Sequence, residues 1–190
     1  MLFTQTVSWY FSIILMAIIV IILFTWRFET FTRLHKHLYN LQSIIIMGPK
    51  SAGKTSFMKE MTDESHREGD FNVGRSDKIQ FIDPHNFNVN KNSHLIKMNK
   101  FNNKSIVYMF DISPYSESIK KQIKDYEKVK KTFDAINHVI VANKMDIKDD
   151  KKLKQIKDNF DSVHAISITK GKGMDKLRNT FSNLSSKQFS

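Results

Sequence analysis

The chain has no cysteine, and among its 190 residues only six are glycine and three are proline. Without cysteine it has no disulfide scaffold, no thiol nucleophile and no zinc site built on thiolates. So few glycines and prolines exclude a collagen-like chain and a flexible-linker architecture. The hydrophobic content of 41% excludes a disordered chain. At this length the sequence predicts one globular domain with an apolar segment attached.

Charged residues are absent from the first 26 residues, so the net charge of +11 belongs to the rest of the chain. Residues 7–26 form an apolar run of about 20 residues, which as a helix would span about 30 Å, the thickness of a bilayer core. Trp9, Tyr10 and Trp26 lie near its ends, where aromatic rings favour the headgroup level. We therefore expect a transmembrane anchor over residues 1–27.

The charges that flank this run predict its orientation. Arg27, Arg33 and Lys36 follow the apolar run and no charged side chain precedes it, so the domain after the anchor is expected in the cytosol. A cleaved signal peptide is the alternative, but its basic start and small-residue cleavage site are missing. Residues 28–42 are then a juxtamembrane connector.

A phosphate-binding motif follows a short apolar run. Residues 43–47 (SIIIM) are typical of a buried strand, and the next eight residues, GPKSAGKT, fit the pattern GxxxxGK[ST] of a P-loop. In such a loop, backbone N–H groups and a helix N-terminus surround phosphate oxygens, Lys54 reaches the β- and γ-phosphates, and the Thr55 hydroxyl binds Mg²⁺. An ordinary glycine-rich turn is the alternative. The predicted phosphate-binding residues are Gly48, Pro49, Lys50, Ser51, Ala52, Gly53, Lys54, Thr55 and Ser56.

A second motif predicts the choice of base. Residues 138–142 are typical of a buried strand, and they lead into Asn143, Lys144, Met145 and Asp146. A carboxylate at Asp146 can accept hydrogen bonds from the N1–H and amino group of guanine, neither of which adenine offers. We expect the stem of Lys144 to lie over the base and Asn143 to tie this loop to the P-loop.

A third segment completes the predicted base site. Residues 163–166 are a further strand candidate, and residues 167–173 (SITKGKG) form a loop before apolar residues at helical spacing from Met174 to Leu184. The predicted base-contacting residues of this loop are Ser167, Ile168 and Thr169.

The order and spacing of these motifs resemble the G domain of the Ras/Arf-type small GTPase superfamily. This resemblance implies an α/β P-loop fold over residues 43–186, with a mostly parallel, doubly wound sheet and with GTP and Mg²⁺ as ligands. It also implies that the backbone N–H of Ile168 contacts the guanine.

The apolar anchor together with residues 44–56 is similar to the beta subunits of the signal recognition particle receptor. That resemblance implies an endoplasmic reticulum membrane protein that binds the N-terminal domain of the receptor alpha subunit in cotranslational targeting. An Arf/Sar-like membrane switch in vesicle traffic is the alternative.

The segment between the first helix and the strand at residues 105–111 is unusually short. A parallel strand at residues 94–100 would leave too few residues for its crossover, so residues 78–83 are the better strand, followed by a short helix near residues 93–100. We expect a short edge strand at residues 71–73, a tight turn at 74–76 and a switch loop within 62–69.

The predicted strand at 78–83 ends at Asp83, the position of the family's magnesium aspartate. His85 is a candidate for positioning the catalytic water, with Lys54 neutralising the developing charge. The glycine that senses the γ-phosphate in the family's DxxG motif is absent from Asp83-Pro84-His85-Asn86. The sequence therefore supports GTP binding more than hydrolysis, and both a cycling switch and a GTP-retaining anchor stay open.

Lysines are concentrated between residues 117 and 157. Two solvated helix faces explain this pattern, and attraction to the anionic membrane leaflet or to ribosomal RNA are the functional alternatives. No sequence-specific nucleic-acid binding is expected, because aromatic residues are not interleaved with these lysines at strand spacing.

Overall fold

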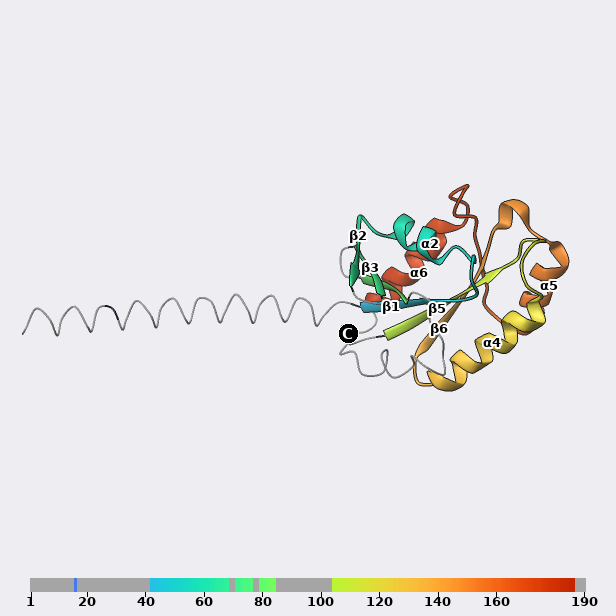
Figure 1. The fold of residues 1–190 in the computed structure, drawn as a ribbon, viewed down its shortest axis with the longest axis horizontal. Helices are drawn as coiled ribbons and strands as arrows, with labels where there is room; N and C mark the ends of the chain where they lie inside the picture. Colours follow the sequence, from blue (N-terminus) through green and yellow to red (C-terminus); the bar gives the residue numbers. More distant parts are fainter. Residues whose placement is uncertain (1–15, 17–41, 69–70, 77–78, 85–103, 187–190) are drawn as a thin grey trace, which may run out of the picture. The chain divides into compact units, whose positions relative to one another are not determined.

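In the computed structural model of the protein, the residues described form one sheet of seven strands in the order β2-β3-β4-β1-β5-β6-β7. Figure 1 shows the ribbon of this fold. The structure describes residue 16 and residues 42–68, 71–76, 79–84 and 104–186. The chain divides into two units, residues 1–40 and 41–190, and the sheet belongs to the second. The strands are β1 (Gln42–Met47), β2 (Glu64–Glu68), β3 (Phe71–Ser76), β4 (Ile79–Pro84), β5 (Lys104–Asp111), β6 (Asn137–Asn143) and β7 (His164–Ala165).

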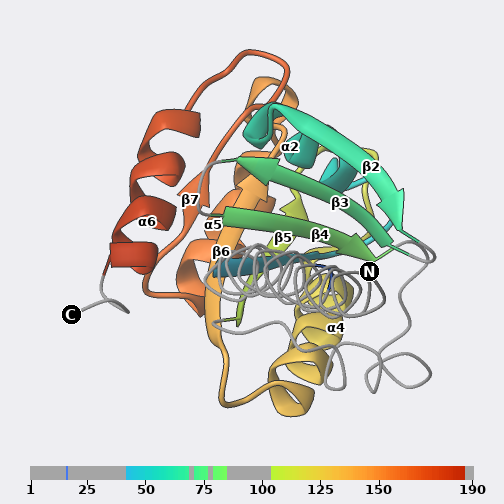
Figure 2. The same ribbon diagram turned by 90° about the vertical axis from the view of Figure 1, so that its left-hand side faces the viewer.

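Helices follow most of the parallel strands, as in other α/β proteins. They are α2 (Lys54–Met61), α4 (Ile119–Thr132), the short 3₁₀ helix η1 (Met145–Ile147), α5 (Asp150–Asn159) and α6 (Met174–Ser186). Strand β1 lies between β4 and β5 and is parallel to both, and β6 and β7 extend the parallel part. The sheet is antiparallel where β3 pairs with β4 and β2 with β3, and Figure 2 shows β2 outermost.

The apolar side chains of β1 alternate between two cores, because successive residues of a strand face opposite sides of a sheet. Ile44 and Ile46 belong to the core that includes α2 and α6. Ile45 and Met47 belong to the core that includes α4 and α5. Both faces of β1 are therefore buried, which explains its continuous apolar sequence.

Three aromatic rings hold the core under α2 and α6. Phe57 of α2, Phe81 of β4 and Phe181 of α6 are each at most 1% exposed. Their ring centroids lie 5.8–6.4 Å apart in edge-to-face arrangements, the geometry that aromatic rings prefer. These contacts fix the P-loop helix and the C-terminal helix against the same strand.

The main predicted elements are confirmed. The strands expected at 43–47, 78–83, 105–111, 138–142 and 163–166 correspond to β1, β4, β5, β6 and β7. The helices expected after the P-loop and from Met174 correspond to α2 and α6, and the two lysine-rich helix faces expected between residues 117 and 157 correspond to α4 and α5.

The predicted switch loop at residues 62–69 is wrong for most of its length. Glu64–Glu68 form β2, which pairs antiparallel with β3 in the register Ser65↔Gly74. The described side chains of β2, residues 64–67, are all exposed. A strand at a sheet edge with no buried face has no alternation of apolar and polar residues, so its sequence gives no strand signal.

The predicted turn at residues 74–76 is also wrong. Gly74 and Ser76 lie within β3 and pair with Phe81 and Ile79 of β4. A Cβ atom at Gly74 would lie 2.7 Å from the side chain of Thr62. The glycine therefore permits a close approach between β3 and the end of α2, a role that glycine also has inside strands.

Several predicted segments lie outside the described residues: the anchor at 1–27 apart from Met16, most of the connector at 28–42, the helix near 93–100, and His85. Within the part of the chain that the structure describes, no helix combines the length and apolar character needed to span a bilayer.

We expect Phe181→Ala to lower the free energy of unfolding by about 3–5 kcal/mol, because it leaves a cavity between α6, α2 and β4. Tyr115→Ala is the matched control, since Tyr115 is 92% exposed, and should change stability by no more than about 0.5 kcal/mol. Chemical denaturation measures both. Equal losses in the two variants would contradict the assigned core.

Candidate functional site

The three predicted motifs lie at the carboxyl ends of the parallel strands, along one edge of the sheet. The P-loop follows β1, Asn143 ends β6, and the loop at 167–173 comes after β7. Since β1, β6 and β7 are parallel strands of one sheet, their carboxyl ends meet at the same edge, which is where open α/β sheets bind ligands. Asp83 lies near the carboxyl end of β4 and reaches this edge as well.

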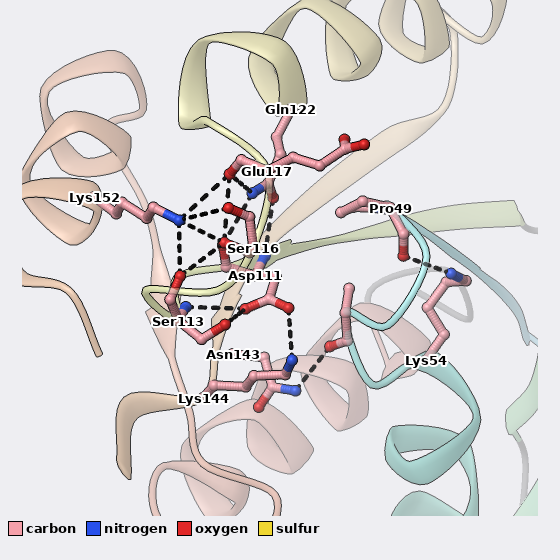
Figure 3. Close-up of polar contacts among 11 residues, drawn as sticks. Pro49, Lys54, Asp111, Ser113, Ser116, Glu117, Gln122, Asn143, Lys144 and Lys152 are labelled. Atoms are coloured by element: carbon pink, nitrogen blue, oxygen red, sulfur yellow. Dashed lines mark hydrogen bonds and ion pairs between the residues drawn. The ribbon is translucent and has the colours of Figure 1, made fainter. Parts of the chain in front are cut away.

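Lys54 turns back over the P-loop. Its ammonium donates a hydrogen bond to the Gly48 carbonyl oxygen at 3.1 Å. It donates another to the Pro49 carbonyl oxygen at 2.9 Å, which Figure 3 shows. Burial lowers the pKa of Lys54, and the nearby Asp83 carboxylate partly offsets this shift. The two carbonyl contacts hold the ammonium inside the loop that the sequence predicts to bind phosphate.

The side-chain amide of Asn143 joins the P-loop to the base loop, residues 143–146. The Asn143 side chain donates a hydrogen bond through Nδ2 to the Ala52 carbonyl at 2.9 Å, across 91 positions of sequence. Gly53 has φ +92°, and a Cβ atom there would lie 2.5 Å from Asn143 Nδ2. Only glycine fits this backbone and this contact. The expected tie between the two loops is therefore present.

Thr55 and Asp83, the two predicted Mg²⁺ ligands, are in direct contact. The Thr55 hydroxyl donates to Asp83 Oδ2 at 2.8 Å, and Asp83 is 2% exposed. Asn72 Nδ2 lies 3.5 Å from the same oxygen. One hydroxyl and one carboxylate suit Mg²⁺ in a nucleotide site, where phosphates and waters complete the coordination. The described residues contain no cluster of three or more acidic or histidine ligands.

Asp146 is held by the third loop. The Ser167 hydroxyl donates to Asp146 Oδ1 at 2.6 Å. This hydrogen bond is the main cause that lowers the pKa of Asp146, which keeps the side chain a carboxylate. Backbone hydrogen bonds between Ser167 and Lys172 close the loop. Ile168 and Thr169 lie inside it, where Ile168 is half-buried and Thr169 is exposed.

The structure brings together almost all predicted site residues. Residues 48–56 form the P-loop and the first turn of α2, Asn143 contacts this loop, and Asp146 contacts Ser167. Lys144 lies between Asn143 and Asp146 with a left-handed backbone, φ 74°. His85 lies outside the described residues.

Sequence reasoning missed one buried polar group. Asp111 at the end of β5 is 3% exposed and accepts a hydrogen bond from Lys144 at 2.6 Å. A signal was present, because an aspartate that ends a strand of buried apolar residues must find a buried partner.

One protein-family model matches a segment of the chain. The family described as nucleolar GTP-binding protein 1 (NOG1) matches residues 98–146, less than half of the chain. That segment runs from before β5 to Asp146. No curated protein matches the chain.

Solved structures share the fold. A crystal structure of a probable GTP-binding protein EngB is similar over 76% of this chain and 99% of its own, with a TM-score of 0.59 and 19% identity. The translation elongation factor SelB from Methanococcus maripaludis, in its apo form, is similar over 76% of this chain and 33% of its own, with a TM-score of 0.56 and 14% identity. The described chain thus has the α/β fold of P-loop GTPases.

We expect Gly53→Ala to destabilise the protein by about 3 kcal/mol, because it adds a clash with Asn143 to the strain of a left-handed alanine. Gly171→Ala separates the two effects. Gly171 has φ +63° but nothing within 4 Å of an added Cβ, so only the strain of about 1 kcal/mol applies. Denaturant unfolding compares the variants. Equal losses would show that the Asn143 contact adds nothing.

Proposed function

We propose that this chain is a GTP-binding protein that holds the phosphates in residues 48–55 and the guanine at Asp146. The observation that carries the proposal is the Asn143–Ala52 hydrogen bond of 2.9 Å. It joins a phosphate-binding loop to a guanine-selecting loop, so both halves of one nucleotide would face one cleft. Asn143 Oδ1 is buried and has no hydrogen-bond partner among the described residues, which leaves an acceptor free at this junction.

Selection of guanine follows from the state of Asp146. Its lowered pKa keeps both oxygens available as acceptors at neutral pH. Guanine offers such a carboxylate its N1–H and its 2-amino group, whereas adenine has an unprotonated N1 and no 2-amino group, so ATP would leave the carboxylate without these two donors. The Ser167 hydroxyl fixes the orientation of this carboxylate.

Binding of the phosphates depends on Lys54, Thr55 and Asp83. Lys54 already lies inside the loop, and phosphate oxygens would replace the Gly48 and Pro49 carbonyls as its acceptors. Thr55 and Asp83 would hold Mg²⁺, directly or through water. When bound, the ion neutralises charge on the phosphates.

We propose further that GTP is retained rather than rapidly hydrolysed. The chain lacks the glycine after Asp83 that small GTPases use to sense the γ-phosphate. Lys54 can stabilise developing charge, and His85 is the proposed residue for positioning water. A cycling switch of the Arf/Sar kind is the second candidate, and the uncharged N-terminal run agrees with either role at a membrane.

A more specific proposal concerns the location of the protein in the cell and the protein that it binds. The uncharged residues 1–26 and the P-loop run at 44–56 support a single-pass anchor in the endoplasmic reticulum membrane with the nucleotide domain in the cytosol. On the same resemblance, the partner is the N-terminal domain of a signal recognition particle receptor alpha subunit, which the chain would recruit for cotranslational targeting.

We expect Asp146→Asn to weaken GTP binding at least about 100-fold, because charged hydrogen bonds to guanine are lost. ATP binding should stay weak and unchanged. Asp150→Asn is the control, since it removes an exposed carboxylate of the same segment, in α5, and should bind GTP as the wild type does. Calorimetric titration with GTP and ATP measures the affinities.

The same preparation tests GTP retention. Guanine nucleotide recovered from the purified protein, with GTP in excess of GDP, would agree with the proposal. Recovery of no guanine nucleotide, or a preference for ATP, would contradict guanine binding. Release of phosphate within a single turnover would contradict retention alone.

We expect the full chain to stay in the membrane fraction after an alkaline carbonate wash. Ile18→Lys with Ile22→Lys should release it, because each lysine at the centre of a span costs about 2.5–3.5 kcal/mol of insertion free energy. Thr32→Lys adds a charge outside the apolar run and is the control. Wild-type protein in the washed supernatant would contradict the anchor.

A further inference from the structure

Asp111 is a buried carboxylate at the carboxyl end of β5 with a complete set of donors. Its Oδ1 accepts hydrogen bonds from the Ser113 backbone N–H at 2.9 Å and from the Ser113 hydroxyl at 2.7 Å. Its Oδ2 accepts from the Lys144 ammonium at 2.6 Å. The carboxylate is therefore fixed on one side by its own loop and bonded on the other to a residue 33 positions away.

Lys144 directly follows Asn143, and its backbone is strained. Its φ of 74° lies in the left-handed region, and among described non-glycine residues only Ser51 of the P-loop shares that feature. Such a conformation persists only where the surroundings hold it. The Lys144 side chain is 28% exposed, and its ammonium is bonded to Asp111.

The Asp111 backbone is fixed by a second set of hydrogen bonds, so Asp111 stays in place if the Lys144 side chain moves. Gln122 of α4 accepts from the Asp111 N–H at 2.9 Å and donates to the Asp111 carbonyl at 2.9 Å (Figure 3). Lys152 of α5 donates to the Ser113 carbonyl at 2.7 Å and to the Ser116 hydroxyl at 2.7 Å. Two helices thus clamp the loop from which Asp111 reaches Lys144.

The Asp111–Lys144 pair borders a hollow beside the P-loop. This hollow, of about 280 Å³, is lined by residues that include Lys50, Ser51, Asp111 and Lys144. Lys144 directly follows Asn143, whose side chain contacts the P-loop. A nucleotide that extends from the P-loop to Asp146 must therefore pass Lys144. The position of the Lys144 stem therefore affects the nucleotide directly, and that of Asp111 only through Lys144.

We propose that Asp111 is a positioning residue for guanine-nucleotide binding. By bonding the Lys144 ammonium, Asp111 keeps this charged group away from the base and keeps the methylene stem of Lys144 against the base. This inference rests on the proposed GTP binding. Loss of the Asp111 carboxylate frees the Lys144 side chain, and each binding event must then restrict it again. The nucleotide dissociates faster as a result.

A double-mutant cycle tests this role with the full chain purified in detergent. Asp111→Asn removes the charge with little change of shape, and Lys144→Met keeps an unbranched stem without the ammonium. We expect each single variant to bind GTP and GDP about tenfold more weakly, chiefly through faster dissociation. The double variant should show the same loss of about tenfold, because either change alone already breaks the contact.

Lys128→Met is the matched control. It removes an exposed ammonium of α4 that pairs with Asp125 and holds neither Asp111 nor Lys144, so this variant should bind GTP as the wild type does. A tenfold loss in this variant would overturn the proposal, because the loss of any ammonium of this layer would then suffice.

The other outcomes separate the two proposals. Single losses that multiply to about 100-fold in the double variant would show that Asp111 does not act through Lys144. Wild-type affinity in Asp111→Asn would overturn the positioning role and leave GTP binding intact. A wild-type chain that binds no guanine nucleotide would overturn both. If Asp111→Asn fails to fold, Lys144→Met alone carries the test, and wild-type affinity with wild-type dissociation in that variant overturns the proposal.

Discussion

The hydrogen bond from the Asn143 amide to the Ala52 carbonyl connects two loops that are far apart in the sequence. Its geometry requires a glycine at position 53, because any side chain there would enter the space of the amide. It also requires β1 and β6 to lie in one sheet with parallel directions, since only then do their carboxyl ends share an edge. Asp146 and the P-loop are placed relative to each other through this contact.

The sheet can hold these loops rigidly because β1 is buried on both faces. Ile44 and Ile46 pack with α2 and α6, while Ile45 and Met47 pack with α4 and α5. The P-loop therefore leaves a strand that has no freedom to shift toward either layer. In contrast, β2 has its described side chains exposed and lies at the sheet edge. The strand that leads into the P-loop is thus packed on both faces, whereas the edge strand is not.

Three lysines near the site have their ammonium groups turned toward the protein. Lys54 bonds to P-loop carbonyls, Lys144 to Asp111, and Lys152 to the loop after β5. Other lysines of α4, such as Lys121 and Lys128, form exposed pairs with nearby acids, which contribute little to stability. The net charge of the chain thus says little about the site, whereas the placement of three ammonium groups organises it.

The sequence by itself determined the P-loop, the motif at Asn143–Asp146, the strand before each and the helices of both layers, because these features depend on local spacing and on buried apolar runs. Asp83 beside Thr55 was also predictable, since the length of a parallel crossover limited where β4 could lie. Tertiary structure decided the rest. Edge strand β2 has no buried face to mark it, and Gly74 serves a close approach to Thr62 that no local pattern contains. The bond between Asp111 and Lys144 depends on how β5, β6 and α4 meet, which is a long-range packing decision rather than a local one.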